Sequence, residues 1–334
     1  MKRITILLSM LSAMILAGAT RAEVVMDLVT VGDRGNRGEL SGEGVGGWGP
    51  NALVGGVDYV YDIGKFEVTV GQYTEFLNAV AADDTHGLYN ASLGGGWQGI
   101  GGITRTGSSG SYTYSVRADR GNRPVNYVGF YDALRFANWM HNGQPSGAQD
   151  TSTTEDGAYD MSLGVNVARN PEATWVIPTE HEWYKAAYYK GGGTDAGYWD
   201  YATQSDTVPA AELPPGTNPI AGSANYNSGD YLDTTYYLTE VGAYTNKPSD
   251  STYGTFDQNG NVWEWNETLI ELSRGLRGGS FCHDHYYLHA AYRIDQYPVL
   301  EYLDYGFRVA RVPEPAALAL LAVGAVALVH RRKR

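Results

Sequence analysis

Apolar residues recur at helical spacing in three segments of the chain. Positions separated by three and four residues predict helices over 70–82, 130–140 and 179–189. The first and third helices follow the capping-box pattern, in which a threonine precedes Gln72 or Glu182 by three residues. The clearest apolar face belongs to the first helix and consists of Val70, Tyr73, Phe76, Leu77 and Val80.

Shorter segments with alternating or continuous apolar residues predict strands. A stretch rich in Gly, Ser and Thr, 85–120, predicts a long loop or a weak hairpin. No internal repeat or linker divides the chain, so we expect one loop-rich domain with many short elements. The predicted strands cover 24–31, 58–67, 175–178, 262–266, 275–281 and 306–312.

The N-terminus has the features of a signal peptide. Lys2 and Arg3 precede a mostly apolar stretch over 4–17, which is too short to span a bilayer comfortably. Small residues before position 23 predict cleavage after Ala22, which would remove residues 1–22. Cleavage a few residues earlier and an uncleaved membrane anchor are the alternatives.

The C-terminus resembles the PEP-CTERM sorting tail. Val312-Pro313-Glu314-Pro315 is followed by an apolar run over 316–329 and by four basic residues, 331–334. The run is shorter than the roughly 20 residues of a stable membrane span, and the basic end would stay on the cytoplasmic side. The resemblance implies that an exosortase-type membrane protease processes 312–334 as a sorting and anchor segment. The domain in between, 23–311, would then reach the cell envelope or the extracellular surface, while an ordinary tail anchor is the alternative.

Charge and cysteine content restrict the function. The formal charge is −13 for the chain and −19 for 23–312, because the two terminal segments hold seven Lys and Arg and one Glu. Such acidity repels the phosphates of nucleic acids and can supply carboxylates for calcium. Cys282 is the only cysteine, so an internal disulfide cannot form in this exported chain.

Five segments between 58 and 311 stand in the order typical of one family. They are Tyr61-Asp62-Ile63-Gly64-Lys65-Phe66-Glu67-Val68-Thr69; Pro124-Val125 with Tyr131-Asp132-Ala133 and Trp139; Ile177-Pro178-Thr179-Glu180-His181-Glu182-Trp183; Asn259-Gly260-Asn261-Val262-Trp263-Glu264-Trp265; and Leu276-Arg277-Gly278-Gly279-Ser280-Phe281 with Ala291-Tyr292-Arg293 and Gly306-Phe307-Arg308-Val309. Together they resemble the formylglycine-generating enzyme (sulfatase-modifying factor) family. The resemblance implies an α+β, C-type-lectin-like fold with a single domain and little regular secondary structure.

The family has structural calcium sites, which the resemblance places on two sets of residues. In the first set, Asp257 and Glu264 would bind through side chains, and Gly260 and Val262 through carbonyl oxygens. Oxygen ligands of this kind suit calcium, although 257–261 also fits a plain polar turn. The second set consists of Asn225, Tyr226, Asp233 and the carbonyl of Thr235.

The residues after Gly279 correspond to the catalytic segment of the family. Active members carry two cysteines five residues apart, whose thiolates hold the Cu(I) with which oxygen converts a substrate cysteine to formylglycine. The resemblance implies Cys282 and Ser280 as catalytic residues. Cys282 lies one residue closer to Ser280 than in the usual pattern, and the place of the second cysteine falls on Tyr287, which cannot replace a thiolate. A packed, unreactive Cys282 is the alternative.

Neighbouring side chains leave further interpretations open. Three histidines, His283, His285 and His289, would suit Zn²⁺ or Cu²⁺ if they converged, and are otherwise solvated loop residues. Trp263 and Trp265 share one face of a predicted strand and are expected to pack in the core.

Three functional hypotheses follow. The favoured one is a non-catalytic surface protein that binds an extracellular ligand, such as an exopolysaccharide or an envelope protein, in an open groove lined by Tyr and Trp. The second is a copper-dependent oxidase, which requires another soft ligand within about 4 Å of the Cys282 sulfur. The third is a different oxidative or hydrolytic role, which requires at least two of the three histidines to converge.

Overall fold

The computed structural model describes residues 23–313, so the predicted signal peptide and nearly all of the predicted sorting tail lie outside the described residues. Its α-helices confirm the three helix predictions and end within two residues of the expected positions. Both predicted capping boxes are present, with Thr69 Oγ1 accepting from the Gln72 amide and Thr179 Oγ1 from the Glu182 amide. The helices are α1 (Val70–Val80), α2 (Phe130–His141) and α3 (Glu180–Tyr188).

The first four-stranded sheet is antiparallel and joins segments from distant parts of the chain. Its strand order is β1-β4-β14-β7, so the last strand of the domain lies inside the sheet. Ala310 is paired with Ile63 on one side and with Val176 on the other. The strands are β1 (Leu28–Val31), β4 (Tyr61–Gly64), β7 (Trp175–Val176) and β14 (Ala310–Arg311).

The second four-stranded sheet has the order β12-β11-β10-β13, and only the pair β10 and β13 is parallel. The start of β10, the end of β11 and the start of β13 therefore meet at one end of this sheet. The predicted strand over 275–281 stops at Arg277, because Gly278 and Gly279 have φ angles of 99° and 72°. The strands are β10 (Trp263–Ile270), β11 (Ser273–Arg277), β12 (Ile294–Gln296) and β13 (Tyr305–Gly306).

Short hairpins and single turns of helix make up the remaining regular structure. The stretch over 85–120 contains a hairpin, β5 and β6, together with two 3₁₀ turns. The pairs are β2 (Glu39–Ser41) with β3 (Ala52–Val54), β5 (Ile103–Thr106) with β6 (Thr113–Val116), and β8 (Ala210–Ala211) with β9 (Ser223–Ala224). The 3₁₀ helices are Glu43–Val45, Ala91–Gly94, Trp97–Gly99, Met161–Asn166 and His285–Leu288.

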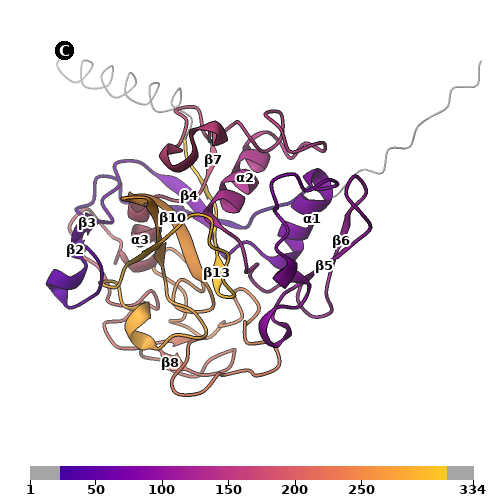
Figure 1. Ribbon diagram of the computed structural model, residues 1–334. Helices are drawn as coiled ribbons and strands as arrows, with labels where there is room; N and C mark the ends of the chain where they lie inside the picture. Colours follow the sequence, from indigo (N-terminus) through magenta and orange to yellow (C-terminus); the bar gives the residue numbers. More distant parts are fainter. Residues whose placement is uncertain (1–22, 314–334) are drawn as a thin grey trace, which may run out of the picture.

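The core lies between the helices and the two sheets. In Figure 1, α1 and α2 lie to the right of β10 and β13, and α3 lies to their left. Phe76 of α1 packs edge to face against Phe136 of α2, which packs in the same way against Phe307. Trp263 and Trp265 are buried, which confirms their predicted place in the core. The chain is a single domain of mixed α and β structure, as predicted, and between residues 23 and 313 no helix is long and apolar enough to cross a membrane.

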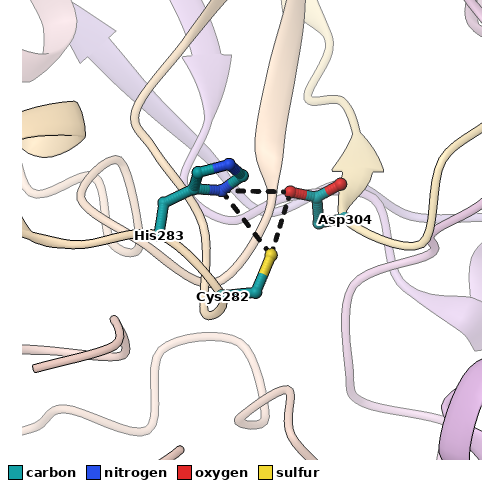
Figure 2. Close-up of side chains that lie close together, drawn as sticks. All are labelled: Cys282, His283 and Asp304. Atoms are coloured by element: carbon teal, nitrogen blue, oxygen red, sulfur yellow. Dashed lines mark hydrogen bonds and ion pairs between the residues drawn. The ribbon is translucent and has the colours of Figure 1, made fainter. Parts of the chain in front are cut away.

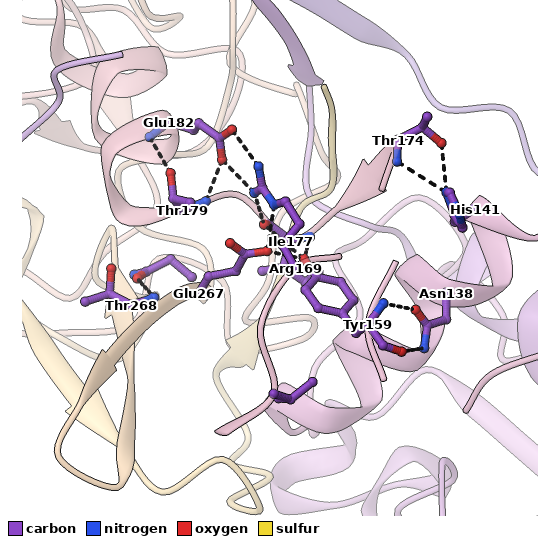
Figure 3. Close-up of polar contacts among 12 residues, drawn as sticks. Asn138, His141, Tyr159, Arg169, Thr174, Ile177, Thr179, Glu182, Glu267 and Thr268 are labelled. Atoms are coloured by element: carbon purple, nitrogen blue, oxygen red, sulfur yellow. Dashed lines mark hydrogen bonds and ion pairs between the residues drawn. The ribbon is translucent and has the colours of Figure 1, made fainter. Parts of the chain in front are cut away.

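A buried polar network ties α3 to β10 (Figure 3). The Arg169 guanidinium donates to both Glu182 oxygens, at 3.0 and 2.9 Å, and to Glu267 Oε1 at 3.0 Å. Glu182 is also the capping-box residue of α3, so one carboxylate caps the first turn of the helix and pairs with a cation. The network fixes the direction in which α3 approaches the second sheet.

Candidate functional site

The predicted catalytic segment lies where three strands of the second sheet begin or end. Trp263 opens β10, Ser280–His283 follow β11, and Asp304 immediately precedes β13. The Trp263 amide donates to the Asp304 carbonyl at 2.8 Å, and the His283 amide donates to the Ser280 carbonyl at 3.1 Å. Backbone hydrogen bonds at the sheet end therefore hold Asp304 beside Trp263 and His283 beside Ser280.

A glycine is required in the turn that leads into this segment. Gly279 has a left-handed φ of 72°, and a Cβ at this residue would lie 2.7 Å from Leu288 and 3.2 Å from the Tyr287 backbone. A larger residue would strain the turn and push Ser280 away from its partners.

Four polar side chains converge on one point at this sheet end. Ser280 Oγ lies 2.7 Å from His283 Nδ1 and 2.8 Å from Asp304 Oδ2. The Cys282 sulfur lies 3.5 Å from His283 Nδ1 and 3.3 Å from Asp304 Oδ2, and Figure 2 shows the three side chains pointing toward one another. The predicted catalytic pair, Ser280 and Cys282, is thus brought together, with 3.3 Å between Oγ and Sγ.

The environment of Cys282 keeps its thiol protonated in the absence of a cation. Burial of the side chain, followed by the charge of Asp304, raises the pKa of Cys282 to about 12. The site is still open to solvent on one side, because a third of the His283 side chain is exposed, whereas only 6% of the Asp304 side chain is.

The copper site implied by the resemblance does not fit these residues. Cys282 is the only cysteine of the chain, and its polar neighbours are the Ser280 hydroxyl, the His283 imidazole and the Asp304 carboxylate. Tyr287, which takes the place of the second cysteine, contributes a ring 4.6 Å from that of His283. Two thiolates for Cu(I) are therefore not available.

Aromatic rings flank the site on two sides. Tyr287 packs against Tyr292, with 4.6 Å between ring centroids. Beyond Phe281, the ring of Tyr231 lies 5.6 Å from that of Trp97, which is 39% exposed. We call Trp97, Tyr231, Tyr287 and Tyr292 the aromatic rim.

The three histidines do not converge on one point, as the third hypothesis would require. His289 accepts from the Ala291 amide and faces Asp200, while His285 packs against the neighbouring ring of Tyr286. In residues 23–313, the one group of three or more His, Cys, Asp or Glu side chains close enough for a metal ion is Cys282, His283 and Asp304. Only one of the three histidines takes part in it.

The first calcium set contains a carboxylate that already has a cation as its partner. Glu264 is fully buried and accepts from Arg308 Nε at 2.5 Å and Nη2 at 2.6 Å, and from the Trp183 indole at 2.8 Å. Asp257 accepts from the Gly242 amide at 2.6 Å. The arrangement of Glu264 therefore does not fit the predicted role of a calcium ligand, and calcium at Asp257 stays a prediction.

The backbone of the first set is fixed by Gly260. Its φ is 87°, and a Cβ at this residue would lie 2.1 Å from the Asn225 carbonyl oxygen. The absence of a side chain at Gly260 lets the turn at 257–261 approach the backbone of Asn225 closely. The turn therefore has a packing role whether or not calcium binds. Val262 lies next to this turn and is completely buried.

The second calcium set is occupied by protein hydrogen bonds. The Asn225 side chain donates to the Tyr237 carbonyl, and the Tyr226 hydroxyl donates to the Pro209 carbonyl. Asp233 Oδ1 accepts from the Thr235 amide at 2.7 Å, and the Thr235 carbonyl accepts from Arg120. The contact between Asp233 and Thr235 is local, two residues apart in the sequence, and calcium at this set stays a prediction as well.

Two carboxylates of functional interest were not predicted from the sequence. Asp304 completes the cluster around Cys282, and Glu67 is buried with no hydrogen-bond partner for either carboxylate oxygen among the described residues. The only signal for Asp304 was its position two residues before the predicted strand over 306–312. Glu67 stood within the first family segment, but nothing marked its side chain as buried.

Comparisons with known proteins agree with the fold. The family model described as the sulfatase-modifying factor enzyme 1-like domain matches residues 55–313, and the PEP-CTERM protein-sorting motif matches residues 311–334. The crystal structure of CarF is similar, with 22% identity, a TM-score of 0.51, and coverage of 86% of this chain and 99% of CarF. Treponema denticola variable protein 1 has 20% identity, a TM-score of 0.53, and coverage of 88% of this chain and 98% of its own. No curated protein sequence matches the chain.

Proposed function

Because the chain belongs to the family of sulfatase-modifying factor enzyme 1-like domains, we propose that it is a family member that binds an extracellular ligand and does not make formylglycine. Its PEP-CTERM motif implies export and exosortase-mediated sorting at the cell envelope. The observation that carries the proposal is the single sulfur at the site, where the family chemistry needs two.

The absence of formylglycine production is directly testable. The purified chain, loaded with Cu(I) under reducing conditions, is mixed with oxygen and a peptide that has a Cys-x-Pro-x-Arg core. We expect the peptide mass to stay unchanged, because one thiol cannot provide the two-thiolate copper site. A family enzyme with both cysteines is the positive control. Conversion by the wild-type chain that is lost in Cys282→Ser would overturn the proposal and favour the oxidase alternative.

The aromatic rim supports the ligand-binding part of the proposal. Partly exposed Trp and Tyr rings provide large contact areas at low entropic cost and recur at binding surfaces. The acidic charge of the domain disfavours anionic polymers, so a neutral glycan or a basic segment of an envelope protein is the favoured ligand. Trp97 is the exposed ring of the rim, whereas the three tyrosines are half-buried.

Removing the Trp97 ring is expected to weaken ligand binding. A ring that anchors a ligand contributes about 2 kcal/mol or more, so Trp97→Ala should weaken the affinity about 30-fold. The measurement is a calorimetric titration of the wild type and each variant with neutral and with acidic fractions of envelope polysaccharide. Trp175→Ala is the matched control, because Trp175 lies in β7 of the sheet that contributes no residue to the site. Equal affinities for the two variants would contradict a role for the rim.

A further inference from the structure

The polar side chains that converge at the sheet end have more hydrogen-bond acceptors than protons to donate to them. The Trp263 indole can only donate, and its Nε1 lies 3.2 Å from His283 Nδ1, so this nitrogen acts as an acceptor. Ser280 Oγ then lies between two acceptors, His283 Nδ1 at 2.7 Å and Asp304 Oδ2 at 2.8 Å, with one proton for both contacts. One of these short contacts therefore lacks a hydrogen. A cation among the acceptors would remove this imbalance.

The three ligand-type atoms have the spacing of a metal site. The distances are 3.5 Å between Cys282 Sγ and His283 Nδ1, 3.3 Å between Sγ and Asp304 Oδ2, and 3.4 Å between Nδ1 and Oδ2. A tetrahedral ion with metal–ligand bonds of about 2.0 to 2.3 Å separates neighbouring ligand atoms by about 3.3 to 3.6 Å. We propose that Cys282, His283 and Asp304 bind one divalent metal ion of the zinc class.

The chemistry of the ligands selects this class of ion. A sulfur and an imidazole nitrogen are poor ligands for calcium or magnesium, which prefer oxygen. A carboxylate is a poor ligand for Cu(I), which prefers soft sulfur. Zinc accepts all three donor types in one tetrahedral site. The site thus differs in both ligands and metal from the two-thiolate copper site of the family.

The scaffold holds the three ligands in place before an ion arrives. Asp304 is fixed through its carbonyl by the Trp263 amide, and the Phe281 amide donates to the Asn261 carbonyl beside Cys282. His283 is partly exposed, which gives the ion a path from solvent. Three protein ligands leave the fourth position of a tetrahedral ion for water or a ligand atom, as in catalytic rather than structural zinc sites.

Ser280 and Trp263 would adjust when the ion binds. Ser280 Oγ is closer to its neighbours than a fourth metal ligand would be, so it serves as a hydrogen-bond partner of the bound carboxylate. The Trp263 indole, whose Nε1 lies 3.2 Å from His283 Nδ1, would lose this hydrogen bond when Nδ1 binds the metal. Metal binding should therefore change the fluorescence of the chain.

Cobalt provides the test, because Co²⁺ occupies zinc sites and reports its ligands. The purified chain is freed of metal by chelation and titrated with Co²⁺ and then Zn²⁺. We expect one equivalent of Co²⁺ to give a thiolate-to-cobalt absorption band and intense tetrahedral bands, and Zn²⁺ to displace it. Cys282→Ser should abolish the thiolate band. His283→Gln and Asp304→Asn should weaken binding by more than about 100-fold, since even second-shell changes cost about 10- to 100-fold.

The matched control is His285→Gln, which changes a histidine two residues away that lies outside the cluster. It should bind Co²⁺ with wild-type affinity. A folded wild-type chain, as judged by near-UV circular dichroism, that gives no thiolate band would overturn the proposal. Equal weakening by His285→Gln and His283→Gln would also overturn it. The metal site does not depend on the proposed ligand binding, because the cobalt spectrum is measured without any ligand.

Discussion

Arg308→Met is expected to lower the free energy of unfolding by about 3 to 5 kcal/mol, because it leaves a buried carboxylate without its cation. Arg308 and Glu264 are both fully buried, and two guanidinium nitrogens bind the two carboxylate oxygens. Arg308 also donates to the carbonyls of Gly64 and Phe256. For a domain of this size the loss corresponds to a fall of roughly 10 °C in the midpoint of thermal unfolding.

Two comparisons separate the ion pair from other effects of the substitution. The double variant Glu264→Gln/Arg308→Met removes both charges and should recover part of the lost stability, since it leaves no unpaired buried charge. Arg37→Ala removes one partner of an exposed pair with Asp195, and should change the stability by less than about 0.5 kcal/mol. A loss for Arg308→Met no larger than that for Arg37→Ala would contradict the assigned role.

Asp257→Asn is expected to stabilise the protein by about 3 kcal/mol at pH 8 and to leave its stability nearly unchanged at pH 4. Burial raises the pKa of Asp257 from 3.8 to about 6. The neighbouring Glu67 also has a raised pKa, because it is buried and lies near the charges of Asp257 and Glu264. The folded state thus binds the Asp257 proton more tightly than the unfolded state does. Its contribution to stability is complete below about pH 4 and is lost as the pH rises through about 6. A shift of about two pKa units corresponds to about 3 kcal/mol.

The substitution should not disturb the backbone. Asp257 has a left-handed φ of 61°, which asparagine tolerates well, and the asparagine oxygen can still accept from the Gly242 amide. Asp230→Asn changes an exposed carboxylate and serves as the control. The measurement is urea unfolding of each variant and the wild type from pH 4 to pH 8.

The same variants decide whether calcium binds at Asp257. A calcium ion held there would stabilise the native state, so a chelator would lower the thermal stability of the wild type and Asp257→Asn would destabilise the protein in calcium. We do not expect calcium to bind Glu264, because its carboxylate is paired with Arg308. A wild type whose thermal stability is unchanged by the chelator would refute calcium at Asp257. A chelator-sensitive wild type whose sensitivity is lost in Asp257→Asn would refute the expected stabilisation by this substitution.

The fold was predictable where the determining contacts are local. The helices from Val70 and Glu180 begin at capping boxes, in which partners three residues apart specify the first turn. The strand expected over 275–281 ended early because Gly278 and Gly279 adopt left-handed conformations. Apolar periodicity alone does not indicate which glycines bend the chain.

The site was predictable only in part, because its partners are distant in sequence. Ser280 and Cys282 were identified from their motif, whereas Asp304 reaches them only through the parallel pairing of β13 with β10. Glu264 was assigned to calcium from the family resemblance, and the sequence did not reveal its partner Arg308, which lies 44 residues away and beyond any local pattern. Burial of the pair, and hence its energetic importance, follows from tertiary structure alone.

The position of β14 links folding to export and to mechanical load. Ala310 is hydrogen-bonded on both sides in the first sheet, and the Val312 amide still donates to the Thr174 carbonyl. The PEP-CTERM motif implies export, and the first sheet is complete only when this last strand of the domain has joined it, so folding of the sheet depends on the final residues of an exported chain. A force applied at the C-terminal end of the domain would have to break the hydrogen bonds of β14 to both β4 and β7 before the strand left the sheet.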